Sequence, residues 1–191
     1  SAWGNGMAVD SSGNIFVGKG GNPSTIVKYN SAGSLLGQFA VLPSSVMRMT
    51  IDSNNNLYAT STSGDDKLIK VTSSGSVSTL KTWLYGTSFG DPDLKGIGVD
   101  SSGNIYVGQD NWELQPSGLY YNQCCVVMKY SSSGSEIGSL GTIPPTGTYN
   151  SMADLPLGSF GYINGIAFDS SGNIYVPDSN NNRVTVFDNA G

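Results

Sequence analysis

The chain has 191 residues, of which 12 % are charged and 38 % are hydrophobic, and its formal net charge is −5. This length is ample for one domain, and the acidic balance argues against a nucleic-acid surface, which needs a basic patch. No apolar run approaches the roughly 20 residues that a membrane-spanning helix needs. The chain contains no histidine, which excludes histidine bases, histidine-ligated zinc and Ser-His or Cys-His nucleophiles within it.

The composition favours strands and turns over helices. Glycine is abundant, with 26 residues, and no long stretch of Ala, Glu, Lys and Leu at helical spacing occurs. We therefore expect an all-β protein. Low lysine content with much serine, threonine and asparagine predicts an extracellular or cell-surface protein.

A short motif, Asp-Ser-Ser-Gly-Asn between two apolar triplets, recurs at 10–14, 100–104 and 169–173, with a close copy at 52–56. Its aspartate can accept hydrogen bonds from backbone N–H groups two or three residues on, and its glycine suits a position that needs positive φ. The second copy has asparagine there, the non-glycine residue that best tolerates this conformation. The pattern predicts a type I hairpin turn with a bulge. Its key residues are Asp10, Gly13, Asp52, Asn55, Asp100, Gly103, Asp169 and Gly172.

These aspartates could also be calcium ligands or catalytic carboxylates. Four copies of one residue in one turn are more simply explained by the turn itself. An EF-hand loop needs a glutamate at its end, and none follows here.

The expected strands follow one order four times along the chain. They are 7–9, 15–17, 25–29 and 35–39; 49–51, 57–59, 67–71 and 77–80; 97–99, 105–107, 126–130 and 136–140; and 166–168, 174–176 and 183–187. Repeated units of four antiparallel strands are typical of β-propeller blades. We expect blades at about 6–39, 48–80, 96–140 and 165–191, the last lacking its outer strand.

The fourth unit resembles an NHL repeat. Gly165–Val176 reads Gly-Ile-Ala-Phe-Asp-Ser-Ser-Gly-Asn-Ile-Tyr-Val, and Asp178–Val184 reads Asp-Ser-Asn-Asn-Asn-Arg-Val. The wider relatives are six-bladed propellers of the gluconolactonase and streptogramin-lyase type. The resemblance implies a single propeller domain or propeller segment over residues 1–191. It leaves open a fragment of a longer propeller, a closed four-bladed ring, or a sheet completed by other copies.

The first three units place a lysine late in their third strand, where the fourth unit has Val186. These lysines are Lys28, Lys70 and Lys129. We expect them to lie on a solvated strand face.

Aromatic residues concentrate in the expected loops of variable length, which are 40–48, 81–96, 109–125 and 141–165. We expect these loops on one face of the disc, where they form a contact surface for a partner protein, another copy or a stacked glycan. Any single ring could instead pack its loop onto the disc. The candidate binding residues are Trp83, Tyr85, Trp112, Tyr120, Tyr121 and Tyr149.

The two cysteines, Cys124 and Cys125, are adjacent. A disulfide between them would be strained, because neighbouring Cα atoms lie closer together than disulfides prefer. Free thiols, this bond and a bridge to another chain are the three alternatives.

The sequence favours a non-catalytic extracellular module for protein interaction or self-assembly, without a metal or other cofactor. A carbohydrate-binding propeller and a calcium-dependent lactonase- or lyase-like enzyme are the alternatives. The candidate carboxylates for calcium are Asp91, Asp93, Asp110, Glu113 and Asp154. Their spacing does not demand a metal, and no catalytic residue of the family can be placed on a matching motif.

Overall fold

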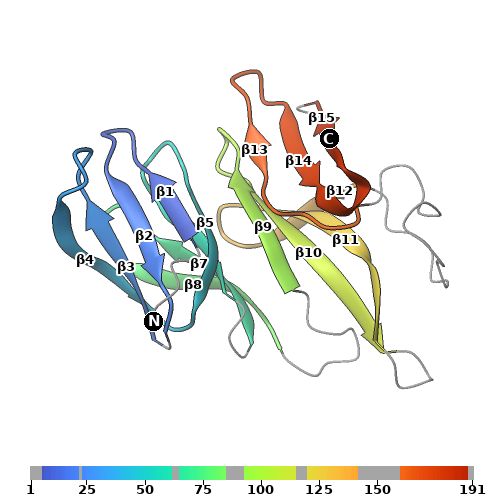
Figure 1. Ribbon diagram of the computed structural model, residues 1–191, viewed down its shortest axis with the longest axis horizontal. Coiled ribbons are helices and arrows are strands. Elements are labelled where there is room, and N and C mark those ends of the chain that lie inside the picture. Colours follow the sequence, from blue (N-terminus) through green and yellow to red (C-terminus); the bar gives the residue numbers. More distant parts are fainter. Residues whose placement is uncertain are drawn as a thin grey trace. The chain divides into compact units, whose positions relative to one another are not determined.

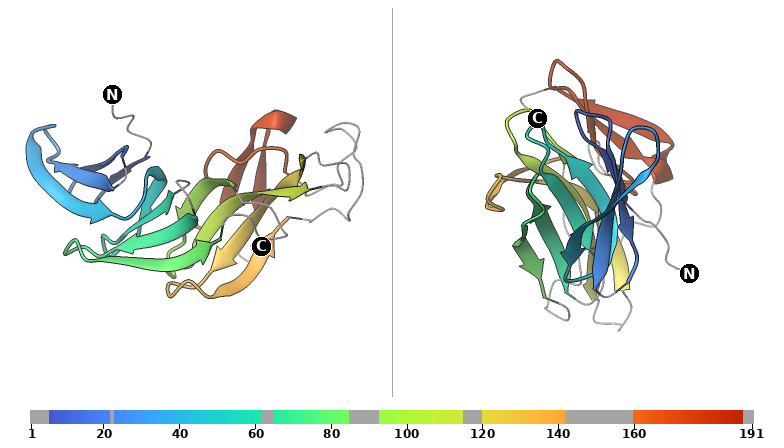
Figure 2. Two further views of the ribbon diagram at one scale, coloured as in Figure 1. Left: turned by 90° about the horizontal axis from the view of Figure 1, so that it is seen from below. Right: turned by 90° about the vertical axis from the view of Figure 1, so that its left-hand side faces the viewer.

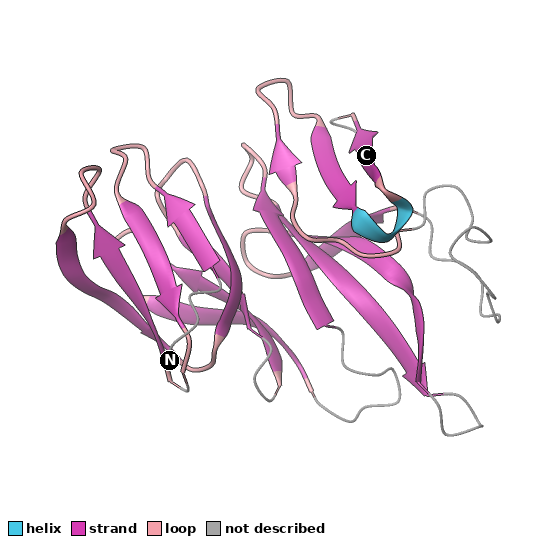
Figure 3. Cartoon of the chain, viewed as in Figure 1, coloured by secondary structure: helices cyan, strands magenta, loops and turns pink. Residues whose placement is uncertain are grey.

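The computed structural model describes residues 6–21, 23–61, 65–84, 93–114, 120–141 and 160–188, and it describes backbone alone at 93, 110–114, 120–124 and 180. The described chain is almost entirely strand, with a 3-10 turn (η2, Ser179–Asn181) late in the sequence (Figure 3). The strands are β1 (Gly6–Val9), β2 (Ile15–Lys19), β3 (Ser24–Tyr29), β4 (Leu35–Leu42), β5 (Val46–Ile51), β6 (Leu57–Ser61), β7 (Asp66–Val71), β8 (Val77–Trp83), β9 (Asp93–Val99), β10 (Ile105–Leu114), β11 (Tyr120–Tyr130), β12 (Glu136–Leu140), β13 (Ala167–Phe168), β14 (Ile174–Asp178) and β15 (Arg183–Phe187).

These strands form four antiparallel sheets in which chain neighbours are also sheet neighbours (Figure 1). The first sheet is β1–β4, the second β5–β8 and the third β9–β12, and the fourth has the three strands β13–β15. The predicted all-β fold of repeated antiparallel blades is therefore confirmed. Within the described residues, the fourth sheet has no outer strand.

The chain divides into two compact units, Ser1–Trp83 and Leu84–Gly191. In the first unit, the first and second sheets stack face to face, with β1 against β5 (Figure 2). Because side chains alternate between the two faces of a strand, the apolar residues on one face of each sheet fill the core between the two sheets. The core residues are Ala8, Phe16, Ile26, Ala40 and Leu42 from the first sheet and Val46, Met49, Leu57, Ala59, Ile69 and Val71 from the second.

The second unit stacks the third and fourth sheets in the same way. Its core includes Tyr106 and Val127 from the third sheet and Ile174 and Val176 from the fourth. The connecting segment adds Phe160 and Ile163, which are fully buried.

The predicted loop at 109–125 is wrong for much of its length. β10 continues to Leu114 and β11 begins at Tyr120, so this segment extends a hairpin in which Leu114 lies opposite Tyr120. The residues that we expected in a loop are paired instead. The antiparallel pairing of β10 with β11 starts at Ile105 and Tyr130 and continues past one irregularity between Asp110 and Trp112. The expected loop at 81–96 is also shorter, because β8 reaches Trp83 and β9 starts at Asp93.

Candidate functional site

The aspartate turn has the same geometry in every sheet. In the first sheet the Asp10 Oδ1 atom accepts hydrogen bonds from the backbone N–H groups of Ser12 (2.9 Å) and Asn14 (2.8 Å). The other oxygen, Oδ2, accepts from the Asn14 side-chain amide at 2.8 Å. The turn closes through the backbone, where the Gly13 N–H donates to the Asp10 carbonyl. The aspartate side chain therefore accepts hydrogen bonds from backbone N–H groups two and four residues later, whereas we expected two or three residues later. Its role is to stabilise the turn.

The left-handed position of each turn is filled by a residue that tolerates it. Gly13, Gly103 and Gly172 have φ values of 79°, 82° and 85°, and Asn55 has φ of 61°. Asn55 also links two sheets, because its Oδ1 atom accepts hydrogen bonds from the Ser11 N–H (3.2 Å) and hydroxyl (3.3 Å).

The repeated lysines do not lie on a solvated strand face, and that expectation is corrected. The Lys28 Nζ atom lies 4.9 Å from the centre of the Phe16 ring and 3.5 Å from Asp10 Oδ2. Lys70 lies over the Tyr58 ring at 5.4 Å. The lysine and the ring occupy directly opposite positions on neighbouring strands, so a cation–π contact forms across the sheet. Lys129 repeats this contact with Tyr106 at 5.1 Å.

Hydrogen bonds and burial around the turns shift the pKa values of an aspartate and a tyrosine. The hydrogen bond from the Asn173 side chain lowers the pKa of Asp169, because it stabilises the charged carboxylate. Burial raises the pKa of Tyr58 to about 12, and the nearby Asp52 carboxylate adds to this effect. Both shifts keep the groups in their ordinary charge states near neutral pH.

The Asp178 side chain accepts several hydrogen bonds in the fourth unit. The sequence places this residue in the NHL-like segment but predicts no role for it. Its side chain is completely buried. One oxygen accepts from the Gly161 N–H at 2.8 Å, and the other accepts from Asn181 Nδ2 (2.6 Å) and Arg183 Nε (3.1 Å). These bonds fasten the segment at 160–163 to the fourth sheet. Asp178 is thus a buried carboxylate whose hydrogen bonds are satisfied, as is usual for buried polar groups with a structural role.

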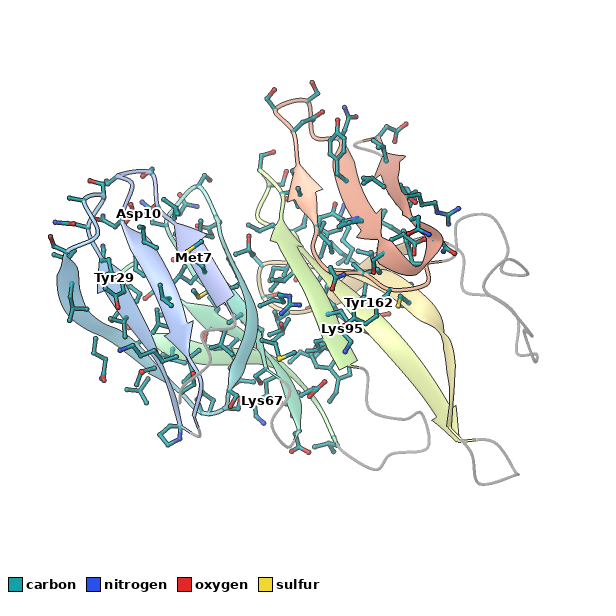
Figure 4. The ribbon with its side chains drawn as sticks, viewed as in Figure 1. Met7, Asp10, Tyr29, Lys67, Lys95 and Tyr162 are labelled. Carbon is teal, nitrogen blue, oxygen red and sulfur yellow. The ribbon has the colours of Figure 1, made fainter. Side chains whose placement is uncertain are left out.

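The same segment is held from the third sheet. The Cys125 N–H donates to the Phe160 carbonyl at 3.1 Å, and its Sγ donates to the Gly161 carbonyl at 3.3 Å. Lys95 Nζ lies 5.1 Å from the centre of the Tyr162 ring, and the two side chains lie close together in Figure 4. Cys125 thus has a packing role, and the side chain of Cys124 lies outside the described part of the chain.

The predicted aromatic binding residues fall on different elements. Trp83 ends β8, opposite Asp66, and the Lys81 Nζ atom lies 5.5 Å from the centre of its ring. Trp112, Tyr120 and Tyr121 belong to the β10–β11 hairpin rather than to a loop, and their side chains are outside the described part. Tyr85 and Tyr149 lie outside the described residues.

The candidate calcium ligands are similarly placed. Asp93, Asp110 and Glu113 lie on strands β9 and β10, described as backbone, whereas Asp91 and Asp154 lie outside the described residues. Among the described side chains, no group of three or more Asp, Glu or Cys residues could hold a metal ion. No helix in the described part of the chain is long and apolar enough to cross a membrane.

One apolar sheet surface is only partly covered by the described residues. Met7, Val17 and Val27 lie directly opposite one another on β1, β2 and β3, and therefore share one face. The next row of that face begins with Val9 on β1. We call this surface the first-sheet face, and its residues are Met7, Val9, Ile15, Val17, Val27 and Tyr29. It is the face turned away from the second sheet, and Figure 4 labels Met7 and Tyr29.

The repeat shows what a covered version of this face looks like. Met7 and Met49 both stand three residues before the aspartate of their turn. Met49 is 8 % exposed and packs in the core against the first sheet, whereas Met7 is 65 % exposed. Val9 is also exposed, while Val27 on β3 is buried. Exposure is therefore greatest along β1. The first-sheet face is as apolar as the equivalent face of the second sheet, but no neighbouring sheet packs on it among the described residues.

Comparison with known sequences identifies one repeat. Residues 160–187 match the model of the NHL repeat family. No curated protein sequence matches the chain.

Solved structures share the fold at low sequence identity. The PQQ-bound aldose sugar dehydrogenase of Streptomyces coelicolor aligns with a TM-score of 0.54 and 15 % identity, over 92 % of this chain and 55 % of that one. Virginiamycin B lyase of Staphylococcus aureus gives a TM-score of 0.52 and 15 % identity, over 98 % of this chain and 67 % of the lyase. A Bacteroides thetaiotaomicron protein of unknown function gives 0.55 and 15 %, over 92 % and 42 %.

This likeness concerns the fold alone, since fold does not fix function. The chain spans only 55 % of the dehydrogenase. The NHL match falls on the fourth sheet and its connecting segment. The chain therefore has a β-propeller fold, and residues 160–187 within it match the NHL repeat.

Proposed function

We propose that this chain is a non-catalytic, extracellular β-propeller module that acts as a building block, binding a second copy of itself through the first-sheet face. The observation that carries the proposal is the contrast between Met7, 65 % exposed, and Met49, 8 % exposed, at the same position of the repeat. Contiguous apolar residues exposed on a protein surface are a mark of interaction sites.

Burial would supply the driving force. Covering apolar side chains releases roughly 25 cal/mol for each Å² removed from water. The six residues of the first-sheet face carry no charge. Lys19, two residues beyond Val17 at the end of β2, lies on the same side of the sheet and is exposed, and its long side chain can keep the ammonium group in water when the apolar residues are covered. The composition, with few lysines and many small polar residues, supports the extracellular location.

The activities of the neighbouring structures do not carry over at 15 % identity. Glycan binding would depend on Trp112, Tyr120 and Tyr121, whose side chains are outside the described part. The support for association comes from the exposed first-sheet face among the described residues.

The test introduces a charge into the first-sheet face. Because Met7 is exposed in the single chain, we expect Met7→Lys to leave the melting temperature nearly unchanged and to reduce self-association strongly. Light scattering would measure the native mass of each variant at equal concentration. The matched control is Ile137→Lys, since Ile137 is 51 % exposed on β12, a strand of the third sheet that contributes no residue to this face. We expect the control to associate like the wild type, and equal behaviour of the two variants would contradict the proposal.

A further inference from the structure

A second apolar surface lies on the fourth sheet. Tyr175 lies opposite Ala167 on one side and Val186 on the other, and Pro177 lies opposite Val184. These residues share the face turned away from the core of the second unit, which contains the alternate residues Ile174 and Val176. We call this surface the fourth-sheet face, and its residues are Ala167, Tyr175, Pro177, Val184 and Val186.

The repeat again shows how this kind of face is covered. Ile26, Val127 and Val184 each stand four residues before the residue that starts or would start the second turn, at Asn30, Ser131 and Asp188. Ile26 and Val127 are 0 % exposed, whereas Val184 is 57 % exposed.

Each of the two buried counterparts lies beneath the following sheet. Ile26 belongs to the core that the first sheet shares with the second. Val127 belongs to the core that the third sheet shares with the fourth. In both stacks, this face of one sheet packs on the Met49-type face of the next one. The first-sheet face is of the Met49 type, so the two exposed surfaces are the two halves of one kind of interface.

We propose that the fourth-sheet face of one copy packs on the first-sheet face of another copy, in the manner in which the third sheet packs on the fourth. This inference rests on the proposed self-association and names the partner surface. Such contact is head to tail, so it joins different patches of the two copies and builds rings or open chains rather than a dimer with one shared patch. None of the side chains that define the two faces is charged. Lys19 lies on the same side of the first sheet, at the end of β2, where its ammonium group can stay in water at the rim of the contact.

A mixing experiment tests this arrangement. We expect Met7→Lys and Val184→Lys each to remain a monomer at concentrations where the wild type is assembled. Each variant keeps one intact face, and the two intact faces are complementary. An equimolar mixture is therefore expected to form a one-to-one heterodimer, seen by light scattering and native mass spectrometry. Circular dichroism checks the folding of both variants, and Val9→Glu with Val184→Glu forms a second pair.

Val186→Lys is the matched control on the same face. The first and third sheets carry Lys28 and Lys129 at this position. Each lysine lies over an aromatic ring on the neighbouring strand of its own sheet. The second sheet packs on the first, and the fourth packs on the third. A lysine here is therefore compatible with this packing, and we expect Val186→Lys to assemble like the wild type.

The outcomes separate the two proposals. Assembly that survives Val184→Lys but not Met7→Lys would show a contact between two first-sheet faces and overturn the head-to-tail arrangement. A mixture that stays monomeric, or loss of assembly in Val186→Lys, would overturn it too. A wild-type chain that is monomeric at every concentration would instead refute the self-association itself.

Discussion

Asn55 combines a backbone requirement with a contact between sheets. Its φ of 61° lies in the left-handed region, where a side chain with a Cβ atom is disfavoured by roughly 1–2 kcal/mol relative to glycine. Its amide oxygen accepts two hydrogen bonds from Ser11 in the turn of the neighbouring sheet. Asparagine thus provides a bond that the glycine of the other three turns cannot make.

This double role predicts different effects for two substitutions. Asn55→Gly keeps the backbone conformation and loses only the exposed bonds to Ser11, so we expect a change in unfolding free energy of at most about 1 kcal/mol. Asn55→Ala loses the bonds and keeps a strained Cβ atom, so we expect it to be less stable than Asn55→Gly by about 1 kcal/mol or more. Urea denaturation measures both values. Equal stabilities would contradict the conformational argument for this turn.

Asp169 predicts how stability depends on pH. The hydrogen bond from the Asn173 side chain lowers its pKa below the ordinary 3.8. A carboxylate with a lowered folded-state pKa stabilises the fold above its unfolded-state pKa, and this contribution is lost as the pH falls through the folded-state value. We therefore expect the unfolding free energy to drop as the pH falls below about 4. Asn173→Ala should raise the Asp169 pKa in a carboxyl NMR titration, and an unchanged pKa would contradict this origin of the shift.

At the residue scale, the turns could be predicted because every participant lies within five consecutive residues. Asp10, Gly13 and Asn14 appear together in the motif, so local chemistry decides their geometry. The role of Asp178 could not be predicted in this way, because its partner Gly161 lies 17 residues earlier in the chain. The lysine contacts were missed for a related reason, since Lys28 meets Phe16 only after β2 and β3 have paired.

At the scale of elements, the close approach of the sheets depends on small residues. A Cβ atom at Gly98, on β9, would lie 2.8 Å from Phe168 Cε2 and 2.9 Å from the Ile166 carbonyl oxygen. The backbone of Gly98 has no positive φ, so its need for glycine comes from packing alone. The fourth sheet must shift if this position gains a side chain.

Two alanine substitutions separate packing from chain flexibility. We expect Gly98→Ala to reduce the unfolding free energy by about 1–3 kcal/mol through overpacking. Gly165→Ala is the control, because no atom lies within 4 Å of its added Cβ, and we expect a change within about 0.5 kcal/mol. Thermal or denaturant unfolding measures both, and similar effects would show that the third and fourth sheets do not pack this closely.

The order of the strands could be predicted from the repeated apolar triplets around each turn. Their ends could not be predicted as well, and the β10–β11 hairpin is the clearest example. The spacing between the expected strands 105–107 and 126–130 predicted a loop from 109 to 125. The backbone ladder nevertheless continues to Leu114 and resumes at Tyr120, because strand pairing extends a hairpin as far as backbone groups remain opposite each other.

At the scale of the whole molecule, sequence could not identify the first-sheet face. Met7 and Met49 are the same residue at the same place in the repeat, and the apolar residues around them are alike. Their difference is 65 % against 8 % exposure, and it arises from the neighbouring sheet that covers one and not the other. Only the three-dimensional arrangement within the first unit distinguishes them.

The measurement that tests self-association most directly is the native mass of the wild-type chain. Light scattering would measure this mass across a concentration series, with and without reductant. We predict a mass that rises above the 19.9 kDa of one chain as concentration increases, with no effect of the reductant, because apolar sheet faces rather than cysteines form the contact. A mass that stays at 19.9 kDa throughout the series would contradict the proposed function.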